Sequence, residues 1–343
     1  MSEPAPLRVG VFGAGAVGCY VGGRLAQAPQ VTLLLVGRPR LAEELHAHGL
    51  TTIDLDGTRT TTREVPFVTE AAPLAETNVV LCCVKSRHTD AAGAALAEVL
   101  APDALVVSLQ NGVRNAEVLR ARLPGREVLA GVVGFNVVAA GEGVFRHTTR
   151  GPLQVERSAD PRARRLHTAL AAAGLPVEEH ADMAPHQWTK LVVNLNNAVS
   201  ALSGAPTGDL LLVPGYRRIV AAVVSEGIAV LRAAGLPLSS FQGVPLTLFP
   251  RFLRLPTLLV RLVAGRQLRA DPAARSSMWQ DLTLGRETEV DFLNGEVVRV
   301  AAAHGLAAPL NQRLVELVHE AERRATGPPD LDPTALAAAL GLP

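Results

Sequence analysis

The stretch that decides the fold of the first half of the chain is Arg8–Gly18, which reads RVGVFGAGAVG. Its apolar beginning is typical of a strand in a parallel sheet, and a helical pattern, Cys19–Ala28, follows its glycines. In this setting the first glycine allows a tight turn, the second lets the backbone approach a pyrophosphate, and the third lets helix and strand pack closely. We therefore expect a dinucleotide at this turn, at the N-terminus of the helix; a glycine-rich turn without a ligand is the alternative. The residues of the turn are Gly13, Ala14, Gly15, Ala16, Val17 and Gly18.

The residues after the second apolar run distinguish between the two nicotinamide dinucleotides. Val31–Val36 is followed by Gly37-Arg38-Pro39-Arg40, with no acidic residue to hold a ribose 2′-hydroxyl. A guanidinium can hold a 2′-phosphate through two hydrogen bonds, whereas a carboxylate would repel it. We therefore expect NADP (NADPH) as the cofactor, held by Arg38 with Arg40 as a second candidate. Two solvated loop arginines are the alternative.

Further apolar runs predict an α/β domain with a parallel sheet. Val79–Val84 and Leu105–Leu109 recur at intervals that suit crossover helices. Thr51–Thr62 predicts a hairpin around Asp56-Gly57, and Val128–Val138 and Leu153–Val155 predict late strands.

From about Asp182 the pattern changes to helices. The predicted helices are His186–Leu202, Pro214–Ala234, Arg275–Gly285, Glu287–His304 and Pro309–Ala325, and short helices with loops are expected over Leu236–Asp271. The predicted organisation is a Rossmann-type NADP-binding domain over 1–181, an all-α substrate domain over 182–326, and a tail over 327–343. We expect this tail to be a frayed end, with a small terminal helix as an alternative.

Composition excludes several classes of partner. The 343 residues suit two domains, and 33 Lys+Arg against 32 Asp+Glu leave a formal net charge of +1, which predicts no nucleic-acid or membrane-surface binding. Hydrophobic residues make up 48% of the chain, which excludes a disordered protein.

Cysteine usage and the most apolar stretch bear on location and assembly. The three cysteines, Cys19, Cys82 and Cys83, have neither disulfide-framework nor zinc spacing, so we expect a cytoplasmic protein without a metal. The N-terminus does not resemble a signal peptide. Leu246–Val263 is interrupted by prolines and arginines, which argues against a membrane span and makes it a candidate homodimer surface.

A lysine and two asparagines stand out in the helical half. In a continuous helix Lys190, Asn194 and Asn197 are at i, i+4 and i+7, on one stripe among Leu and Val. A buried lysine must be paired or have its pKa lowered by desolvation, and such a lysine suits the general acid of a ketone reduction. A lysine that extends to solvent beside structural amides is the alternative.

Two later segments supply partners for this lysine. Any of the three acids Glu287, Glu289 and Asp291 could pair with it, and their spacing does not choose between them. Arg275–Met278 predicts a helix cap and nothing more.

The order of six motifs resembles that of the 2-dehydropantoate 2-reductase (ketopantoate reductase) family, within the 6-phosphogluconate dehydrogenase-like superfamily. The resemblance extends from Arg8 to about Glu320. The motifs are GAGAVG at Gly13–Gly18, CCVKS at Cys82–Ser86, QNGV at Gln110–Val113, WTKLVVN at Trp188–Asn194, ARSSMWQDL at Ala274–Leu282 and GRETEVDFLNG at Gly285–Gly295.

This resemblance implies NADPH-dependent reduction of a small 2-oxo acid, ketopantoate, to pantoate in pantothenate and coenzyme A biosynthesis. It assigns Lys190 as the catalytic lysine that protonates the ketone oxygen, and Glu289 as the glutamate that supports it. Lys85 matches a lysine near cofactor and substrate, and Asn111 an asparagine that contacts both. The implied substrate-binding residues are Asn111, Asn194, Asn197 and Ser277, with Ser277 at the substrate carboxylate.

The sequence departs from the family pattern at three positions. Ala198 stands where an asparagine is usual, with Asn197 as its replacement, and Thr207 and Ala274 replace two further asparagines. These changes concern substrate binding, so a reductase or dehydrogenase for another 2-oxo or hydroxy acid is the alternative. A non-catalytic NADP-binding regulator is disfavoured, because Lys190 and Glu289 are both present.

Overall fold

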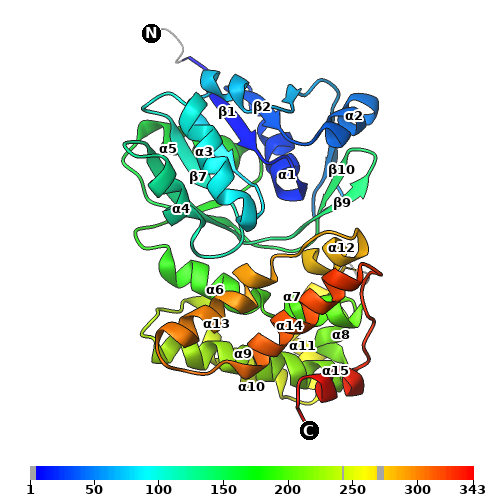
Figure 1. The fold of residues 1–343 in the computed structure, drawn as a ribbon. Coiled ribbons are helices and arrows are strands. Elements are labelled where there is room, and N and C mark those ends of the chain that lie inside the picture. The colour runs from blue at the N-terminus through cyan, green and yellow to red at the C-terminus, as the bar shows by residue number, and fades with distance from the viewer. Residues whose placement is uncertain (1–4, 242, 269–273) are drawn as a thin grey trace. The chain divides into compact units, whose positions relative to one another are not determined.

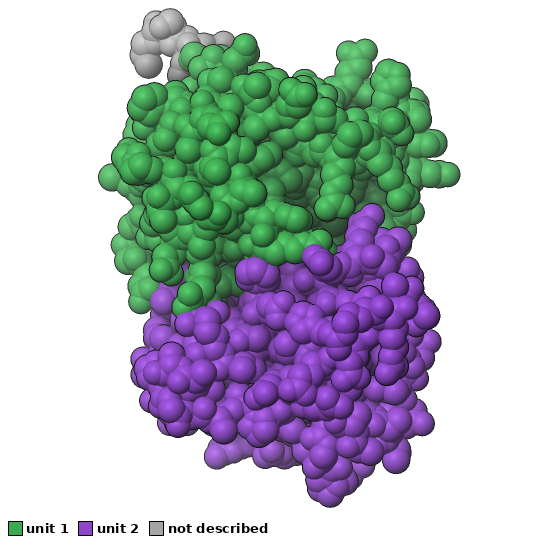
Figure 2. All heavy atoms as spheres, viewed as in Figure 1, with its two compact units in different colours: residues 1–183 green, residues 184–343 purple. Residues whose placement is uncertain are grey.

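The structure is a computed structural model that describes residues 5–241, 243–268 and 274–343. The chain divides into two compact units, Met1–Met183 and Ala184–Pro343, which Figure 2 colours green and purple. The first unit is built on sheets and the second is almost entirely helical (Figure 1), which confirms the predicted fold class. Within the described residues no helix is both long and apolar enough to cross a bilayer.

The first unit contains an eight-stranded sheet with the order β12-β11-β8-β7-β6-β1-β2-β5. All neighbouring strands are parallel except β8 and β11, which are antiparallel. Its strands are β1 (Leu7–Phe12), β2 (Val31–Val36), β5 (Phe67–Val68), β6 (Val79–Cys82), β7 (Leu105–Ser108), β8 (Glu127–Val133), β11 (Leu153–Glu156) and β12 (Val177–His180).

The strand order reverses next to β1, which pairs with β2 on one side and with β6 on the other. In open parallel sheets, ligands bind outside the carboxyl ends of the strands at such a reversal. The glycine turn follows β1, Lys85 follows β6, and Asn111 follows β7, so the topology places all three at this edge.

Helices cover both faces of this sheet, because alternate residues of each strand point to opposite faces. Val79 and Leu81 of β6 belong to one buried cluster, together with side chains of α1 and α5, and Val80 and Cys82 belong to another with α3 and α4. The helices of the unit are α1 (Ala16–Leu25), α2 (Pro39–His48), α3 (Thr89–Val99), α4 (Asn115–Arg122) and α5 (Pro161–Ala172), with 3-10 turns η1 (Ala72–Glu76) and η2 (Ser86–His88).

Two hairpins form a second sheet, with the order β4-β3-β10-β9. The predicted hairpin is confirmed as β3 (Leu50–Ile53) and β4 (Arg59–Thr62), and Gly57 in its turn has a φ of 86°. The second hairpin is β9 (Val137–Gly141) and β10 (Val144–His147).

The second unit is organised around α9, whose 20 residues include eleven buried ones. It contacts α6, α7, α8, α10, α13, α14 and α15. The bounds are α6 (Ala184–Asn194), α7 (Asn196–Ser203), α8 (Thr207–Leu212), α9 (Pro214–Ala233), β13 (Ser240–Phe241), β14 (Val244–Pro245), η3 (Leu246–Leu248), α10 (Phe249–Leu253), α11 (Thr257–Leu268), α12 (Ser277–Thr283), η4 (Val290–Phe292), α13 (Asn294–Ala303), α14 (Pro309–Arg324) and α15 (Pro333–Ala339). The end of the segment expected over Leu236–Asp271 lies outside the described residues.

Three predicted helix boundaries are wrong. The first helix begins at Ala16 rather than Cys19, since Gly15 is already its N-cap. The helix expected from His186 to Leu202 is divided at Leu195 into α6 and α7. The helix expected from Glu287 begins only at Asn294, because the preceding residues form a loop and the short η4.

The small terminal helix that the sequence allowed for is present as α15, but the C-terminal residues are folded rather than frayed. Asp332 accepts hydrogen bonds from two backbone amides at the start of α15, and Leu336 of α15 is fully buried. The Leu331 amide donates to the Leu202 carbonyl, and the Tyr216 hydroxyl donates to the Leu331 carbonyl. The segment therefore belongs to the helical unit. It is anchored by the buried Leu336 and by hydrogen bonds to residues more than 100 positions earlier in the chain.

Candidate functional site

The glycine turn has the geometry of a phosphate cradle. Gly13 has a φ of +99°, and a Cβ added there would lie 2.5 Å from the Val84 backbone nitrogen. A Cβ on Gly18 would lie 2.6 Å from the Gly13 carbonyl oxygen, whereas at Gly15 the nearest atom is 4.0 Å away. Two of the glycines therefore permit close packing within the protein, and Gly15 keeps open the space above an exposed helix N-terminus. These residues fit a dinucleotide pyrophosphate.

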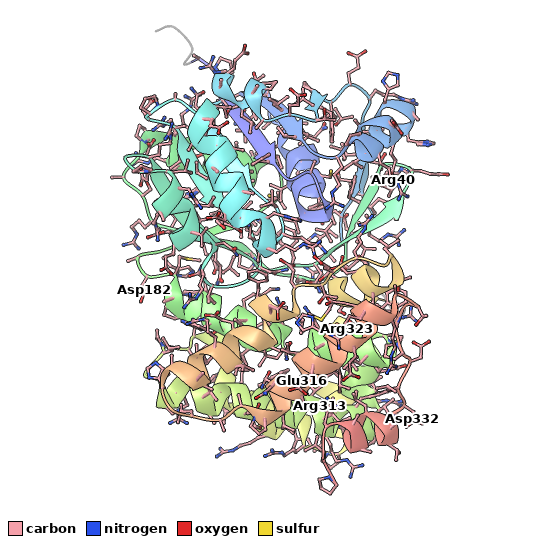
Figure 3. All side chains as sticks on the ribbon, in the orientation of Figure 1. Arg40, Asp182, Arg313, Glu316, Arg323 and Asp332 are labelled. Carbon is pink, nitrogen blue, oxygen red and sulfur yellow. The ribbon has the colours of Figure 1, made fainter. Side chains whose placement is uncertain are left out.

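The end of β2 lies beside this turn. The Gly13 and Ala14 amides both donate to the Val36 carbonyl, at 3.0 and 2.8 Å. Arg38 is exposed and is the N-cap of α2, and Arg40 is exposed in the first turn of that helix (Figure 3). Arg38 and Arg40 therefore follow directly after the end of β2, which is hydrogen-bonded to the glycine turn.

Lys85 and Asn111 lie on neighbouring loops, after β6 and β7. The Ser86 hydroxyl donates to the Asn111 carbonyl at 2.6 Å, and the Asn115 side-chain amide donates to the same carbonyl. These bonds tie the residue after Lys85 to the backbone of Asn111. Both candidates are half-buried.

A buried polar network supports these two loops, and the sequence did not reveal it. The Gln110 side-chain amide donates to the Val84 carbonyl at 3.0 Å and to the Thr89 hydroxyl at 2.7 Å. Thr89 in turn donates to the Asn115 side chain at 2.8 Å. Gln110 belongs to the QNGV motif, but the bonds of Thr89 to Asn115 and Gln110 span more than 20 residues and leave no sequence signal.

Lys190 lies on α6, between the buried residues Thr189 and Leu191. It keeps some exposed surface, yet desolvation lowers its pKa to about 8. Among the described residues no carboxylate forms an ion pair with it. An ammonium of this kind remains mostly protonated at neutral pH and gives up its proton more readily than an ordinary lysine.

The helix division at Leu195 separates the predicted stripe. Lys190 and Asn194 lie on α6, while Asn197 lies on α7. Leu195 is buried against α9, where a Cβ on Gly227 would lie 2.6 Å from its Cδ1 atom. Asparagines on both sides of this leucine weaken the helix locally, because their side chains compete for backbone hydrogen bonds.

The asparagine that replaces the usual family position is accessible. Asn197 is half-buried, whereas Ala198 is fully buried. The Asn197 backbone carbonyl accepts a hydrogen bond from the Ser276 hydroxyl at 3.2 Å, so α7 lies beside the start of α12.

Ser276 and Ser277 have different functions in the structure. The buried Ser276 hydroxyl caps α12 by accepting from the Trp279 amide at 3.1 Å, as the sequence predicted for this segment. Ser277 is exposed at the first position of the helix. Its hydroxyl is therefore accessible to a ligand near Asn197.

Glu289 is half-buried and directly precedes η4. The segment after it is anchored by the buried side chains Val290 and Leu293. The Asn294 side-chain amide then donates to the Leu195 carbonyl at 3.3 Å and to the Asn311 side chain at 2.9 Å. Asn294 therefore joins the Glu289 segment to the junction that follows Lys190 and Asn194.

Two of the departures from the family pattern touch each other. The Thr207 amide donates to the Ala274 carbonyl at 2.8 Å, so the start of α8 lies beside the residues that precede α12. Both substitutions therefore change one local surface, close to Ser277.

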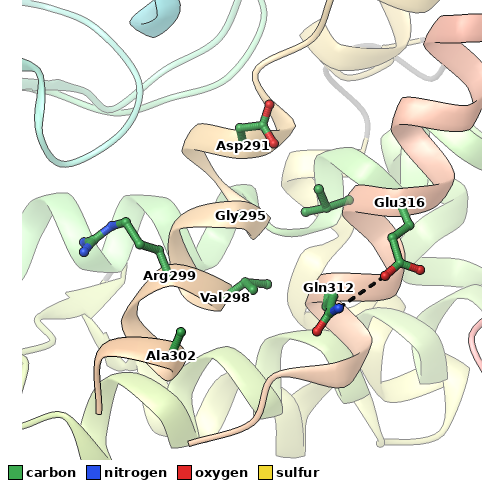
Figure 4. A pocket seen from close by; sticks show the side chains of 8 residues that line it. Asp291, Gly295, Val298, Arg299, Ala302, Gln312 and Glu316 are labelled. Atoms are coloured by element: carbon green, nitrogen blue, oxygen red, sulfur yellow. Dashed lines mark hydrogen bonds between the residues drawn. The ribbon is translucent and has the colours of Figure 1, made fainter. Parts of the chain in front are cut away.

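The candidate residues do not line the groove between α13 and α14. This groove has a volume of about 370 Å³ (Figure 4). It is lined by Asp291, Gly295, Val298, Arg299, Ala302, Gln312, Val315 and Glu316. In the part of the chain that the structure describes, no group of histidine, cysteine and acidic side chains could hold a metal ion.

A Rossmann-type sheet with an open glycine cradle, together with a helical unit that carries a desolvated lysine, defines a dinucleotide-dependent oxidoreductase. Residues 9–160 match the family model described as ketopantoate reductase PanE/ApbA, and residues 182–322 match the C-terminal model of the same family. The chain belongs to the ketopantoate reductase family.

Individual relatives agree with this assignment. The 2-dehydropantoate 2-reductase of Halobacterium salinarum is 32% identical over 322 residues, which cover 92% of this chain and 99% of the relative. A PanE/ApbA family ketopantoate reductase from Ralstonia eutropha has a crystal structure with a TM-score of 0.77 and 35% identity, covering 93% and 99% of the two chains. A D-mandelate dehydrogenase solved with NADH and anilino(oxo)acetate has the same fold, with a TM-score of 0.75, 21% identity, and 93% and 99% coverage.

Substitution by alanine is expected to act differently at Gly13 and at Gly15: on stability at the first and on dinucleotide binding at the second. We expect Gly13→Ala to lower the free energy of unfolding by at least about 1–3 kcal/mol, because of its positive φ and its contact with Val84. Gly15→Ala is expected to change stability by less than about 0.5 kcal/mol but to weaken dinucleotide binding. Urea unfolding and NADPH fluorescence titration measure the two effects. Wild-type affinity in Gly15→Ala would show that the pyrophosphate does not lie on this turn.

Proposed function

We propose that this protein reduces 2-dehydropantoate (ketopantoate) to pantoate with NADPH. The observation that carries the proposal is the 32% identity to a 2-dehydropantoate 2-reductase over 92% of the chain. The desolvated Lys190 supports it, since reduction of a ketone needs an acid beside the oxygen. This reaction belongs to the biosynthesis of pantothenate and coenzyme A.

The first unit holds the cofactor in this proposal. The Gly13–Gly18 turn and the amides of α1 face the pyrophosphate, and Arg38 pairs with the 2′-phosphate. Lys85 and Asn111 contact the nicotinamide ribose side and the substrate, from loops that Ser86 holds together. When bound, the nicotinamide supplies the hydride that adds to C2 of the substrate.

The second unit holds the acid and moves the proton. Ser277 donates a hydrogen bond to the substrate carboxylate, and the side-chain amides of Asn194 and Asn197 bind its polar groups. Lys190 Nζ donates a hydrogen bond to the ketone oxygen and then transfers its proton there, as the C2–O bond becomes single. The ammonium stabilises the negative charge that develops on this oxygen. Glu289 is the supporting carboxylate and acts without an ion pair to Lys190 among the described residues.

The proposed compartment and assembly follow from two further features. Cys19, Cys82 and Cys83 are free thiols, which fits the reducing cytoplasm. Leu258, Leu262 and Val263 of α11 are 73%, 80% and 71% exposed, and Arg217 anchors the start of this helix through the Leu255 carbonyl and the Thr257 hydroxyl. We propose that a second copy of the chain covers this face in a homodimer.

Substitution of the exposed leucines tests the homodimer. We expect Leu258→Glu with Leu262→Glu to convert a dimer into a folded monomer, because a symmetric interface then buries each charge twice. Analytical ultracentrifugation measures the mass, and Leu284→Glu, which changes an exposed leucine elsewhere, is the control. A wild-type monomer at all concentrations would contradict the proposal.

The substrate and the acid are tested together. We expect wild-type enzyme to prefer ketopantoate among a panel of 2-oxo acids, with kcat/KM falling as pH rises through about 8, where Lys190 loses its proton. Lys190→Ala should lower kcat by about 10²- to 10⁴-fold with little change in NADPH affinity. Steady-state kinetics over pH 6–10 and a binding titration measure both.

Two outcomes would contradict this proposal. A clear preference for another oxo acid would favour a paralogous reductase whose substrate surface is altered at Thr207 and Ala274. Unchanged turnover in Lys190→Ala would assign the proton to another group.

Arg38 is expected to select NADPH over NADH. Arg38→Ala should weaken NADPH binding by roughly 10- to 100-fold, since it removes a charge-assisted bond to the 2′-phosphate. NADH binding should be nearly unchanged, because that dinucleotide lacks the phosphate. Fluorescence titration with both dinucleotides measures the effect, and Arg40→Ala is the neighbouring comparison. Equal losses for both dinucleotides would refute this function of Arg38.

A further inference from the structure

The segment that carries Glu289 is attached to α14 on both sides of that residue. On one side the Thr288 amide donates to Glu322 Oε1 at 2.7 Å. On the other side Asp291 Oδ1 lies 2.9 Å from His319 Nε2. Because the two attachments flank Glu289, together they restrict the movement of its backbone.

A third hydrogen bond joins the two attachments. His319 Nδ1 lies 2.7 Å from Glu322 Oε2, so the imidazole bridges two carboxylates. A carboxylate only accepts hydrogen bonds, and a neutral imidazole has a single N–H. The ring can therefore hold both carboxylates only when it is protonated. We call Glu322, His319 and Asp291 the brace.

The charges of the brace favour this protonated form. Burial by itself lowers the pKa of His319, but the hydrogen bonds to Glu322 and Asp291 outweigh it and hold the pKa above 6.5. Burial raises the pKa of Glu322, but the bonds from the Thr288 amide and from His319 outweigh it and hold that pKa below 4.5. The two directions agree on an imidazolium beside an ionised Glu322 carboxylate.

Other charged side chains of α14 lie within about one turn of His319. Glu316 is three residues before it and Arg323 four residues after it. Glu316 is paired with Arg313 at 2.9 Å (Figure 3). The carboxylates in hydrogen-bond contact with the ring are Asp291 from η4 and Glu322 from α14.

We propose that His319 and Glu322 are positioning residues, which fix the Glu289 segment on α14 through Asp291 and Thr288, and that this hold weakens when His319 loses its proton. The inference deepens the proposed function and rests on it for the role of Glu289. Val290 and Leu293 are buried and anchor the same segment independently of these hydrogen bonds, so we expect variants of the brace to fold.

The pH range over which the brace holds the Glu289 segment follows from the pKa shifts of His319 and Glu322. His319 has a raised pKa, so its contribution is complete below 6.5 and is lost as pH rises through the folded-state value. Glu322 has a lowered pKa, so its contribution is complete above 4.5 and is lost as pH falls through its folded-state value. The hold is therefore strongest in weakly acidic solution.

Amide hydrogen exchange tests the hold without reference to activity. In the wild-type full chain, the protection factor of the Thr288 amide should decrease between pH 6 and pH 8.5. In His319→Gln it should be about tenfold lower at pH 6 and should show no further loss over that range. Glu322→Gln should also lower it. NMR detection of this amide makes the measurement residue-specific.

Two control variants carry the same chemical changes elsewhere. His167→Gln removes an imidazole that is hydrogen-bonded to Glu179 in the other unit, and Glu316→Gln removes a carboxylate from α14 itself. Both should leave the protection of the Thr288 amide at the wild-type value. If His319→Gln and Glu322→Gln leave it there too, the brace does not hold the segment and the proposal is overturned.

Kinetics then test the positioning of Glu289. We expect His319→Gln to lower kcat for ketopantoate reduction severalfold while leaving KM for NADPH unchanged. The wild-type profile should show a decrease attributable to His319, which His319→Gln lacks, in addition to the decrease near pH 8 that Lys190 causes. Lost protection with unchanged kcat would overturn the positioning role. Absence of ketopantoate reduction in the wild type would refute the proposed function instead, and the exchange results would still decide whether the brace exists.

Discussion

The close approach of two backbones at Gly13 and Val84 is the constraint on which the cofactor half depends. A single Cβ at Gly13 would lie 2.5 Å from the Val84 nitrogen. The first turn can therefore lie directly against the end of β6, where Lys85 follows. The loop after β7 is attached to the same strand end, because the Gln110 side chain donates to the Val84 carbonyl and the Ser86 hydroxyl donates to the Asn111 carbonyl. Three strand ends are thus fixed relative to one another by backbone and amide contacts.

In the helical unit the corresponding constraint is the desolvation of the Lys190 ammonium group. Lys190 has a lowered pKa because its surroundings are apolar, and not because another cation lies nearby. A lysine of this kind is a better proton donor than one paired with a carboxylate, since an ion pair would raise its pKa again. The absence of an ion pair with Lys190 among the described residues is therefore compatible with a supporting role for Glu289. The residues on either side of Glu289, Thr288 and Asp291, are hydrogen-bonded to α14.

Much of the fold could be predicted because its signals are local. The strand Val31–Val36 and the helix Pro214–Ala233 end where runs of apolar residues meet turn or cap residues. The asparagines beside Leu195 weaken the helix locally, but the division there was not predicted, because Leu195 also packs against Gly227 of α9, more than thirty residues away. The start of α13 at Asn294 likewise depends on hydrogen bonds to Leu195 and Asn311. Non-local contacts of this kind leave no periodic pattern in the sequence.

By itself the sequence determined the parallel sheet, the glycine turn, the absence of an acid after β2 and the presence of Lys190 and Glu289, because residue type and spacing decide these features. The tertiary structure alone decided that Gly15 keeps a space open while Gly13 and Gly18 close one, and that Ser276 caps a helix while Ser277 is exposed. It also decided that Thr288 and Asp291, on either side of Glu289, contact residues of α14. The reason is physical: desolvation, close packing and hydrogen bonds between distant segments exist only after the chain has folded.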